Sequence, residues 1–363
     1  MNSSTDVLGQ FYEVFLKYGN GAKEIGIVLT PRHVTRFGVE VVGVSYRDVV
    51  LDPACGTGGF LVAAFDHVRR TATKPQIEQF RLHSLFGIED EASVAVLAIV
   101  NMILRGDGRN HIIEGNSFST NLVKHTVDGH ASAKYSKSPP QPGEEAVTRV
   151  PMNPPFAKGD DAKEYLFVKR ALSLMEHGGI LFGLVPLGAM FRDGDEHVWR
   201  KDDLLRQHTL LAVVSLPERL FVPAANKQVL AIIVKKGTPH PVIQPVFWGR
   251  VSHDGHVVIK SRRLPAKDFD PPRVEPNQLE TLLPTLRAFV AAPGTISVNE
   301  AEFCKTAPID FSDPLLELIP EAYVEGRVPT AGELKEAVDD IARETVSYLV
   351  KFRRFTIFAV IPA

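Results

Sequence analysis

The sequence of 363 residues has very little cysteine and no long apolar run. Its two cysteines, Cys55 and Cys304, are too few for a disulfide framework, and such scarcity is typical of a reducing compartment. The amino terminus, MNSSTDVLGQ, has neither a charged start nor an apolar core, so we expect no secretory signal. The longest apolar segments, such as VLAIIV, are far shorter than the roughly 20 residues that cross a bilayer. We therefore expect a cytoplasmic protein that is not bound to a membrane.

The sequence also lacks several motifs that define common enzyme classes. It has no Walker loop, no H-E-x-x-H and no cysteine–histidine pairs with zinc spacing, so we expect no metal site. Its 41 basic and 43 acidic residues give a net charge of -2, so any affinity for nucleic acid must come from a local patch or a partner. Two short basic runs, KSRR at 260–263 and KFRR at 351–354, could contact phosphates, although such runs are usually solvated faces.

Apolar runs alternate with helical segments through the first two thirds of the chain. The predicted strands are DVVLD, LFGIED, HIIEGN, ILFGLVP, LLAVVSLP and VLAIIVKKG. The predicted helices between them include FLVAAFDHVRR, ASVAVLAIVNMILRG and YLFVKRALSLMEHGG. This alternation predicts an α/β fold with a doubly wound, mostly parallel sheet, because parallel strands are buried on both faces and need helical crossovers.

The regions around this core have a different character. Residues 1–47 predict a helical lead in which Thr30-Pro31 begins a helix with proline at its first position. Residues 119–146 are polar and proline-rich, which predicts a long loop beside the site. We place one domain at 1–240 and a smaller region at 241–363, which has short strands such as HVVIK and an amphipathic final helix. Thr330 and Glu333 have capping-box spacing in that helix, before an apolar face of Leu334, Val338, Ile341, Thr345 and Leu349.

The segment LDPACGTGGF places an acid and a glycine-rich turn between a strand and a helix. Gly56 and Gly58 can adopt positive φ and let a ligand approach the backbone. The spacing is not that of a dinucleotide fingerprint, and Asp52 before the turn suits a cationic ammonium better than a phosphate. A plain tight turn around a buried Cys55 is the alternative, but the density of glycines favours a ligand site.

The next strand, in FGIED, ends in a second acid. Glu89 can accept both hydroxyls of a ribose, although a solvated loop acid would have the same sequence. A ligand with a ribose at one end and an amine at the other matches both acids. S-adenosylmethionine has both groups, so we expect it to be the cofactor.

The segment VPMNPPFAKG combines one amide with rigid and planar neighbours. Asn153 offers both an acceptor and a donor, Pro154 and Pro155 leave backbone carbonyls without competing N–H groups, and Phe156 offers a flat face. An exocyclic amine on a stacked base could donate to Asn153 and to the Pro154 carbonyl, with its lone pair left to attack a methyl sulfonium. Asn-Pro-Pro is also good turn chemistry, but its position after a nucleotide-type loop favours catalysis.

Together, DPACGTGGF and NPPF resemble the amino-methylating DNA methyltransferases. The likeness covers roughly residues 8–240 and is strongest to N6-adenine methyltransferases similar to the modification subunits of type I restriction-modification systems. The resemblance implies a seven-stranded Rossmann-like sheet with a final antiparallel strand. It also implies double-stranded DNA as substrate, a separate specificity subunit and a restriction subunit as partners.

The resemblance assigns roles to individual residues. GIVLTPRHVTRFG matches the family segment that touches the methionine end of the cofactor, which implies roles for Thr30 and Pro31. SLPERLFVP matches the segment whose aromatic residue packs against a flipped adenine, which falls on Phe221. The implied cofactor site comprises Thr30, Pro31, Asp52, Pro53, Ala54, Cys55, Gly56, Gly58, Glu89 and Asn116. The implied catalytic residues are Asn153, Pro154, Pro155 and Phe156, with Phe156 and Phe221 stacking on the base.

The chain departs from the family pattern at two places. Asn116 in EGNSF stands where the family usually has an aspartate, but an asparagine oxygen can still accept from the adenine amino group of the cofactor. Pro151 interrupts AVTRVPMN, the strand before the catalytic motif, where a proline is unfavourable in a central position. Two alternatives to DNA methylation therefore remain: methylation of a protein glutamine or of RNA, and a catalytically inactive DNA-binding subunit.

Overall fold

The computed structural model describes residues 28–105, 111–156, 163–222, 225, 227–259, 262–268, 277–298 and 303–325, with single positions between 332 and 343. The chain forms two compact units, Met1–Val324 and Glu325–Ala363. Of the predicted apolar face in the second unit, only Val338 is described, and it is helical and 62% exposed. Thr330, Glu333 and the other residues of that face lie outside the described residues, as do the lead before residue 28 and the KFRR run.

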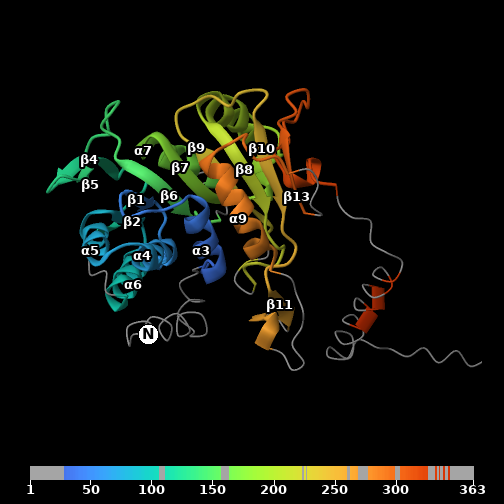
Figure 1. The fold of residues 1–363 in the computed structure, drawn as a ribbon, viewed down its shortest axis with the longest axis horizontal. Coiled ribbons are helices and arrows are strands. Elements are labelled where there is room, and N and C mark those ends of the chain that lie inside the picture. The colour runs from blue at the N-terminus through green and yellow to red at the C-terminus, as the bar shows by residue number, and fades with distance from the viewer. Residues whose placement is uncertain are drawn as a thin grey trace, which may run out of the picture. The chain divides into compact units, whose positions relative to one another are not determined.

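A nine-stranded sheet runs through the first unit in the order β3-β2-β1-β6-β7-β9-β8-β10-β13 (Figure 1). The strands are β1 Val50–Asp52, β2 Leu85–Glu89, β3 Ile112–Glu114, β6 Val147–Met152, β7 Met175–Pro186, β8 Thr209–Ser215, β9 Val229–Lys235, β10 Pro245–Arg250 and β13 Cys304–Pro308. Only β9 and β13 run antiparallel to their neighbours, which confirms a mostly parallel sheet. The sheet has nine strands instead of the expected seven, because β10 and β13 extend it beyond β8.

Helices cover both faces of this sheet, as a doubly wound fold requires. They are α3 Arg32–Val41, α4 Gly59–Thr71, α5 Lys74–His83, α6 Ala92–Leu104, α7 Glu164–Leu174, α8 Asp195–Val198 and α9 Gln278–Ala291. Shorter helical segments are η1 Leu187–Met190, η2 Trp199–Leu205, η3 Ala266–Asp268 and η4 Pro320–Ala322. None of the helices in the described part of the chain combines the length and the apolar character needed to cross a bilayer.

Alternation along β7 divides the interior into two hydrophobic cores. Phe182 and Leu184 belong to the core beneath α3, α4 and α9, whereas Leu181 and Val185 belong to the core beneath α7 and η2. Successive side chains of a strand point to opposite faces, so a strand buried on both sides must be apolar throughout. This arrangement explains the unbroken apolar runs of the sequence.

The polar segment 119–146 is not a long loop, and that prediction was wrong. It contains a hairpin of β4 Asn121–Val127 and β5 His130–Ser136, in which Val127 lies opposite His130. Asp128 and Gly129 form the two-residue turn with φ of 49° and 80°. An Asp-Gly pair with both φ values positive matches the twist of the flanking strands, so this dipeptide was the signal for a hairpin.

Pro151 lies inside the central strand β6, as the sequence suggested and despite the rarity of proline there. It pairs with Phe182 of β7, while the ladder between β6 and β1 is recorded only at Arg149 and Val50. Proline has no N–H to donate, and the recorded ladder with β1 stops two residues before it. Arg149 also donates from Nε to the Val42 carbonyl at 2.8 Å, which attaches the end of α3 to this strand.

Candidate active site

The glycine-rich turn connects β1 to α4 at the carboxyl end of the sheet. Gly56 and Gly58 have φ of 54° and 81°, and Gly58 is the N-cap of α4. A Cβ atom added to Gly56 would meet no atom within 4 Å, so this part of the turn faces open space. The turn therefore leaves room for a ligand against its backbone, as the sequence predicted.

Glu89 at the end of β2 is tied directly to this turn. Its Oε2 accepts a hydrogen bond from the Gly56 N–H at 2.9 Å, and its Oε1 accepts one from the Glu91 N–H at 3.1 Å. The two strands are neighbours, with Asp52 of β1 opposite Gly87 of β2. A carboxylate has lone pairs beyond these two bonds, so Glu89 can still accept hydroxyl donors.

Asp52 is buried at the root of the turn. Its Oδ1 accepts a hydrogen bond from the Ala54 N–H at 3.2 Å. Burial and the charge of Glu89 raise the pKa of Asp52 to about 8, although the hydrogen bond from Ala54 acts in the opposite direction and lowers it. A cation bound beside Asp52 would favour the ionised form and would compensate for part of this burial.

The thiol of Cys55 is inside the core and not in the open part of the turn. Burial raises the pKa of the Cys55 thiol, and the nearby charges of Asp52 and Glu89 raise it further. The Cys55 N–H donates to the Ile88 carbonyl at 3.0 Å and fixes the turn against β2. Cys55 therefore contributes to this site through its backbone and its packing.

Asn116 follows β3 and lies in an exposed turn. Its side-chain oxygen accepts a hydrogen bond from the Phe118 N–H at 2.8 Å. The next residue, Ser117, donates from its hydroxyl to the Pro53 carbonyl and joins this turn to the glycine-rich turn. The sequence did not single out Ser117, although its position directly after Asn116 in EGNSF was a signal.

Asn153 directly follows β6 and contacts the segment before α3. Its Nδ2 donates to the Thr30 hydroxyl oxygen at 2.9 Å. Its Oδ1 is buried and has no hydrogen-bond partner among the described residues. Pro31 is the N-cap of α3, one position before the first helical residue, so the helix begins one residue later than predicted. Thr30 and Asn153, assigned separately from the sequence, are direct neighbours.

The two predicted stacking residues contact each other. The rings of Phe156 and Phe221 have centroids 5.4 Å apart and planes at 66°, and Phe221 is only 4% exposed. Lys227 places its Nζ 5.5 Å from the centroid of the Phe156 ring and 4.0 Å from Glu164 Oε1. A base between the two rings would require them to separate. Nothing in the sequence pattern pointed to Lys227.

Comparisons with known proteins identify relatives of this chain. A family model described as "N-6 DNA Methylase" matches residues 3–310. The type II restriction enzyme and methyltransferase RM.BcgI of Heyndrickxia coagulans is 35% identical over 266 residues, which are 71% of this chain and 39% of that protein. The type I restriction enzyme EcoEI methylase subunit of Escherichia coli is 27% identical over 248 residues, which are 64% of this chain and 47% of that protein. The chain thus spans less than half the length of these relatives.

Solved structures share the fold at low identity. A chain of a type I restriction-modification system matches with a TM-score of 0.66 and 24% identity, covering 96% of this chain and 71% of its own. The M protein of the type I restriction enzyme EcoKI matches with a TM-score of 0.60 and 17% identity. The match covers 92% of this chain and 75% of that protein's chain. The resemblance stated from DPACGTGGF and NPPF is confirmed by the family match. The chain belongs to the N-6 DNA methylase family.

Proposed function

We propose that this protein transfers a methyl group from S-adenosylmethionine to N6 of adenine in double-stranded DNA, as the modification component of a restriction-modification system. The observation that carries the proposal is the arrangement of Asn153. Its amide nitrogen is held by Thr30, while its buried Oδ1 has no partner among the described residues. A buried acceptor without a partner costs free energy, and an amine donor would satisfy it.

The residues of the turn fit the proposed cofactor. Asp52 suits its ammonium, Glu89 can accept the ribose hydroxyls, and the open side of Gly56 gives access to the backbone. Thr30, Pro31, Pro53, Ala54, Cys55, Gly58 and Asn116 complete the proposed cofactor site. S-adenosylmethionine would supply an electrophilic methyl group on a sulfonium.

The chain's own residues would hold and polarise the target amine. The N6 amine donates one hydrogen to Asn153 Oδ1 and one to the Pro154 carbonyl, which orients the nitrogen lone pair away from the ring plane. Methyl transfer from the sulfonium would leave the nitrogen positively charged, so its proton would become acidic and could pass to solvent. No strong base is therefore needed. Pro155 stiffens the turn, and Phe156 and Phe221 offer flat faces for a base flipped out of the duplex at a cost of about a few kcal/mol.

A methyl-transfer assay with labelled cofactor, offering DNA, RNA and protein in parallel, tests the proposed substrate. We expect label in DNA, at adenine N6, and none after Asn153→Ala. Label only in RNA or in a protein glutamine would replace DNA as the substrate. Calorimetry with S-adenosylmethionine separates both results from a catalytically inactive subunit, which would show no binding.

We also propose that recognition of a DNA sequence depends on a separate specificity subunit, and cleavage on a restriction subunit. The chain has a net charge of -2 and its basic runs are short and dispersed, so no single run supplies the set of cations that several phosphate contacts require. The proposed site of action is the cytoplasm, where thiols such as the buried Cys55 and Cys304 stay reduced. The purified chain on a plasmid, with and without its genomic neighbours, tests the partner. Efficient methylation of one defined sequence by the lone chain would place recognition within residues 241–363.

A further inference from the structure

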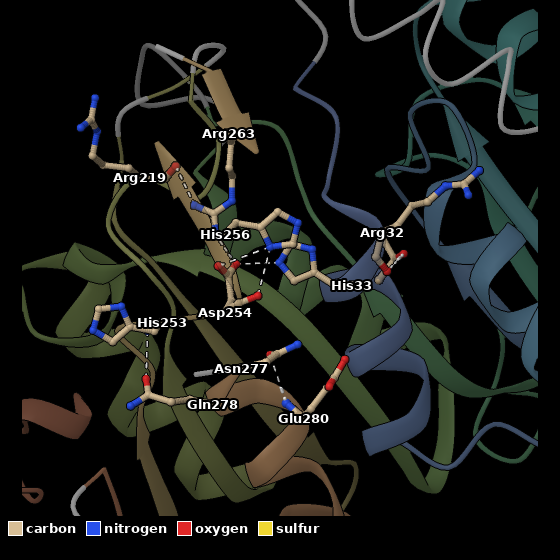
Figure 2. Close-up of polar contacts among 11 residues, drawn as sticks. Arg32, His33, Arg219, His253, Asp254, His256, Arg263, Asn277, Gln278 and Glu280 are labelled. Atoms are coloured by element: carbon tan, nitrogen blue, oxygen red, sulfur yellow. Dashed lines mark hydrogen bonds and ion pairs between the residues drawn. The ribbon is translucent and has the colours of Figure 1, made fainter. Parts of the chain in front are cut away.

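A buried carboxylate, Asp254, lies at the centre of a polar cluster outside the proposed catalytic residues (Figure 2). Asp254 is 1% exposed and lies in the connection between β10 and the hairpin of β11 His256–Ile259 and β12 Arg262–Pro265. His33 Nε2 lies 2.6 Å from its Oδ2, which also forms an ion pair with the Arg263 guanidinium. His256 Nδ1 lies 3.7 Å from Oδ1, and its ring stacks on His33 with centroids 4.4 Å apart. We call these four residues the Asp254 cluster.

The charges of the Asp254 cluster are balanced within it. Burial alone would raise the pKa of Asp254, but the interactions with His256 and His33 and the charge of Arg263 outweigh burial and lower it. Burial also lowers the pKa of His33, so a neutral imidazole donates its Nε2–H to the carboxylate. The ligand atoms of His33, Asp254 and His256 lie within 4.8 Å of one another, a spacing a metal ion could bridge. Arg263 on the same carboxylate disfavours a second cation there, so we interpret the cluster as an ion pair with two imidazole partners.

One arm of the cluster leads to Asn153. His33 is in the first turn of α3, where the Pro31 carbonyl accepts hydrogen bonds from the Val34 N–H at 2.9 Å and the Thr35 N–H at 3.1 Å. Thr30, immediately before this turn, accepts the hydrogen bond from Asn153 at 2.9 Å. A displacement of His33 would therefore move the partner of the proposed catalytic amide.

The other arm leads to Phe221. Arg263 Nη1 donates to the Arg219 carbonyl at 3.3 Å, two residues before Phe221 in the chain. Phe221 in turn contacts Phe156, three residues after Asn153. Arg219, Asp254 and Arg263 also line a cavity of about 560 Å³ beside this segment. The contacts thus form a closed ring from Asn153 through Asp254 to Phe221 and back through Phe156.

We propose that Asp254 is a positioning residue that fixes the segment of Thr30 and the segment of Phe221 relative to each other, and so aligns the target base with Asn153. Its role in alignment rests on the proposed function, whereas the mechanical linkage does not. Asp254 Oδ2 contacts both His33 of one segment and Arg263 of the other, so loss of the carboxylate removes the acceptor of His33 and leaves the buried charge of Arg263 unpaired. The two segments should therefore respond together when Asp254 is changed.

Hydrogen exchange tests the linkage without any activity. Asp254→Asn should speed amide exchange at least tenfold both in 31–35 and in 217–222 with Ala225, where the Leu220 N–H donates to the Pro217 carbonyl and the Ala225 N–H donates to the Phe221 carbonyl. His33→Phe should speed exchange only in the first segment. Arg263→Lys replaces the planar guanidinium that contacts Arg219, so it should speed exchange only in the second segment. These single-arm variants keep the test decisive if Asp254→Asn fails to fold.

A control is the ion pair of Asp66 on α4 and Arg105 after α6. Asp66 Oδ2 and Arg105 Nη1 lie 2.9 Å apart, with Arg105 buried and Asp66 half-buried. Asp66→Asn removes a similar pair but has no recorded contact with Thr30, Asn153 or Phe221, so neither segment should exchange faster. Faster exchange confined to the hairpin, or equal acceleration everywhere in both variants, would overturn the proposal.

Turnover tests the alignment. If wild-type protein methylates DNA, Asp254→Asn should lower kcat on the order of 10- to 100-fold, because small misplacements of reacting groups have effects of that size. The affinity for S-adenosylmethionine and the KM for DNA should change less than threefold. An unchanged kcat would remove the alignment role. Absence of methyl transfer by the wild type would instead contradict the proposed function and leave the exchange result to decide the linkage.

Discussion

The two sides of the proposed active site are built differently. On the cofactor side, the glycine-rich turn and Glu89 come from successive strands, and Gly56 and Glu89, which share a hydrogen bond, are 33 residues apart. Thr30 contributes to both sides. The target side joins distant segments: Thr30 and Asn153 are 123 residues apart, and His33 and Asp254 are 221 residues apart. The cofactor side is therefore fixed by one strand–turn–helix unit and its neighbour, whereas the target side depends on tertiary packing.

This difference has a consequence for function. A site within one β-α-β unit can be rigid as soon as that unit folds. A site held by long-range contacts can open and close, as the base site must if Phe156 and Phe221 separate around an adenine. Variants that affect one side and not the other would sharpen the comparison.

The largest effect is expected from Asn153→Ala. Loss of one hydrogen bond to a buried group costs about 1–3 kcal/mol, and misalignment of the amine adds to it, so the rate should fall at least about 100-fold. Affinity for the cofactor should stay nearly unchanged in calorimetry. Asn101→Ala is the contrasting variant, because Asn101 Nδ2 donates to the Thr57 carbonyl at 2.9 Å and supports the cofactor turn. It should weaken cofactor binding more than the rate, and near-normal turnover of Asn153→Ala would refute the mechanism.

Gly56→Val should come next. It places a branched side chain in the open space of the turn and strains a backbone with φ of 54°, so cofactor affinity should fall at least about tenfold. Gly43→Val is a matched control, because Gly43 has φ of 64°, a Cβ there would also meet no atom within 4 Å, and it follows α3. Both variants should lose similar thermal stability, and only Gly56→Val should lose affinity. Equal affinities would show that the cofactor does not pass this backbone.

Smaller effects are expected from the aromatic pair. Phe156→Ala and Phe221→Ala should each weaken productive DNA binding by about 1–3 kcal/mol, the usual value of a base–aromatic contact. Phe156→Tyr should be tolerated, because stacking needs only a flat face. Binding to a duplex with a mismatch at the target adenine measures this directly. A tolerated Phe156→Ala would mean that the base is held in another way.

The last expected effect concerns stability and not activity: it is the pH dependence of stability caused by Asp52. Its folded pKa of about 8 lies above the ordinary carboxyl pKa of 3.8, so the unfolded chain releases the proton first as the pH rises. Asp52 therefore destabilises the fold increasingly between about pH 4 and pH 8, and by a constant amount above that range. The thermal midpoint of Asp52→Asn relative to wild type should rise across that window and then level off. Parallel pH profiles for the two proteins would contradict the raised pKa.

The comparison also explains how much could be predicted from the sequence. The alternation of runs such as LLAVV with helices predicted the sheet, and the glycines predicted a turn that Figure 1 places between β1 and α4. Asn153 was recognisable because its neighbours Pro154 to Phe156 form a local motif. The hydrogen bond from Asn153 to Thr30, the ammonium of Lys227 beside the Phe156 ring and the Asp254 cluster were not predictable, because no local spacing encodes contacts between residues so far apart. The hairpin at 121–136 had a local signal in its Asp128-Gly129 turn. It was missed because its strands are polar and do not show the apolar pattern of a buried strand.

The extension of the sheet by β10 and β13 determines which strands lie at its edges, where separate copies of a protein can pair and aggregate. Both edge strands are short: β3 has three residues, and β13 has five and ends in Pro308. Short edges with proline offer little backbone for pairing with another chain. A chain ending before Cys304 would instead leave β10 at the edge, with Val246, Phe247 and Trp248 in a row and unpaired N–H and C=O groups. We expect such a truncated chain to aggregate by pairing edge to edge. The inferred role of β13 is therefore to cover β10, although it lies outside the proposed catalytic residues.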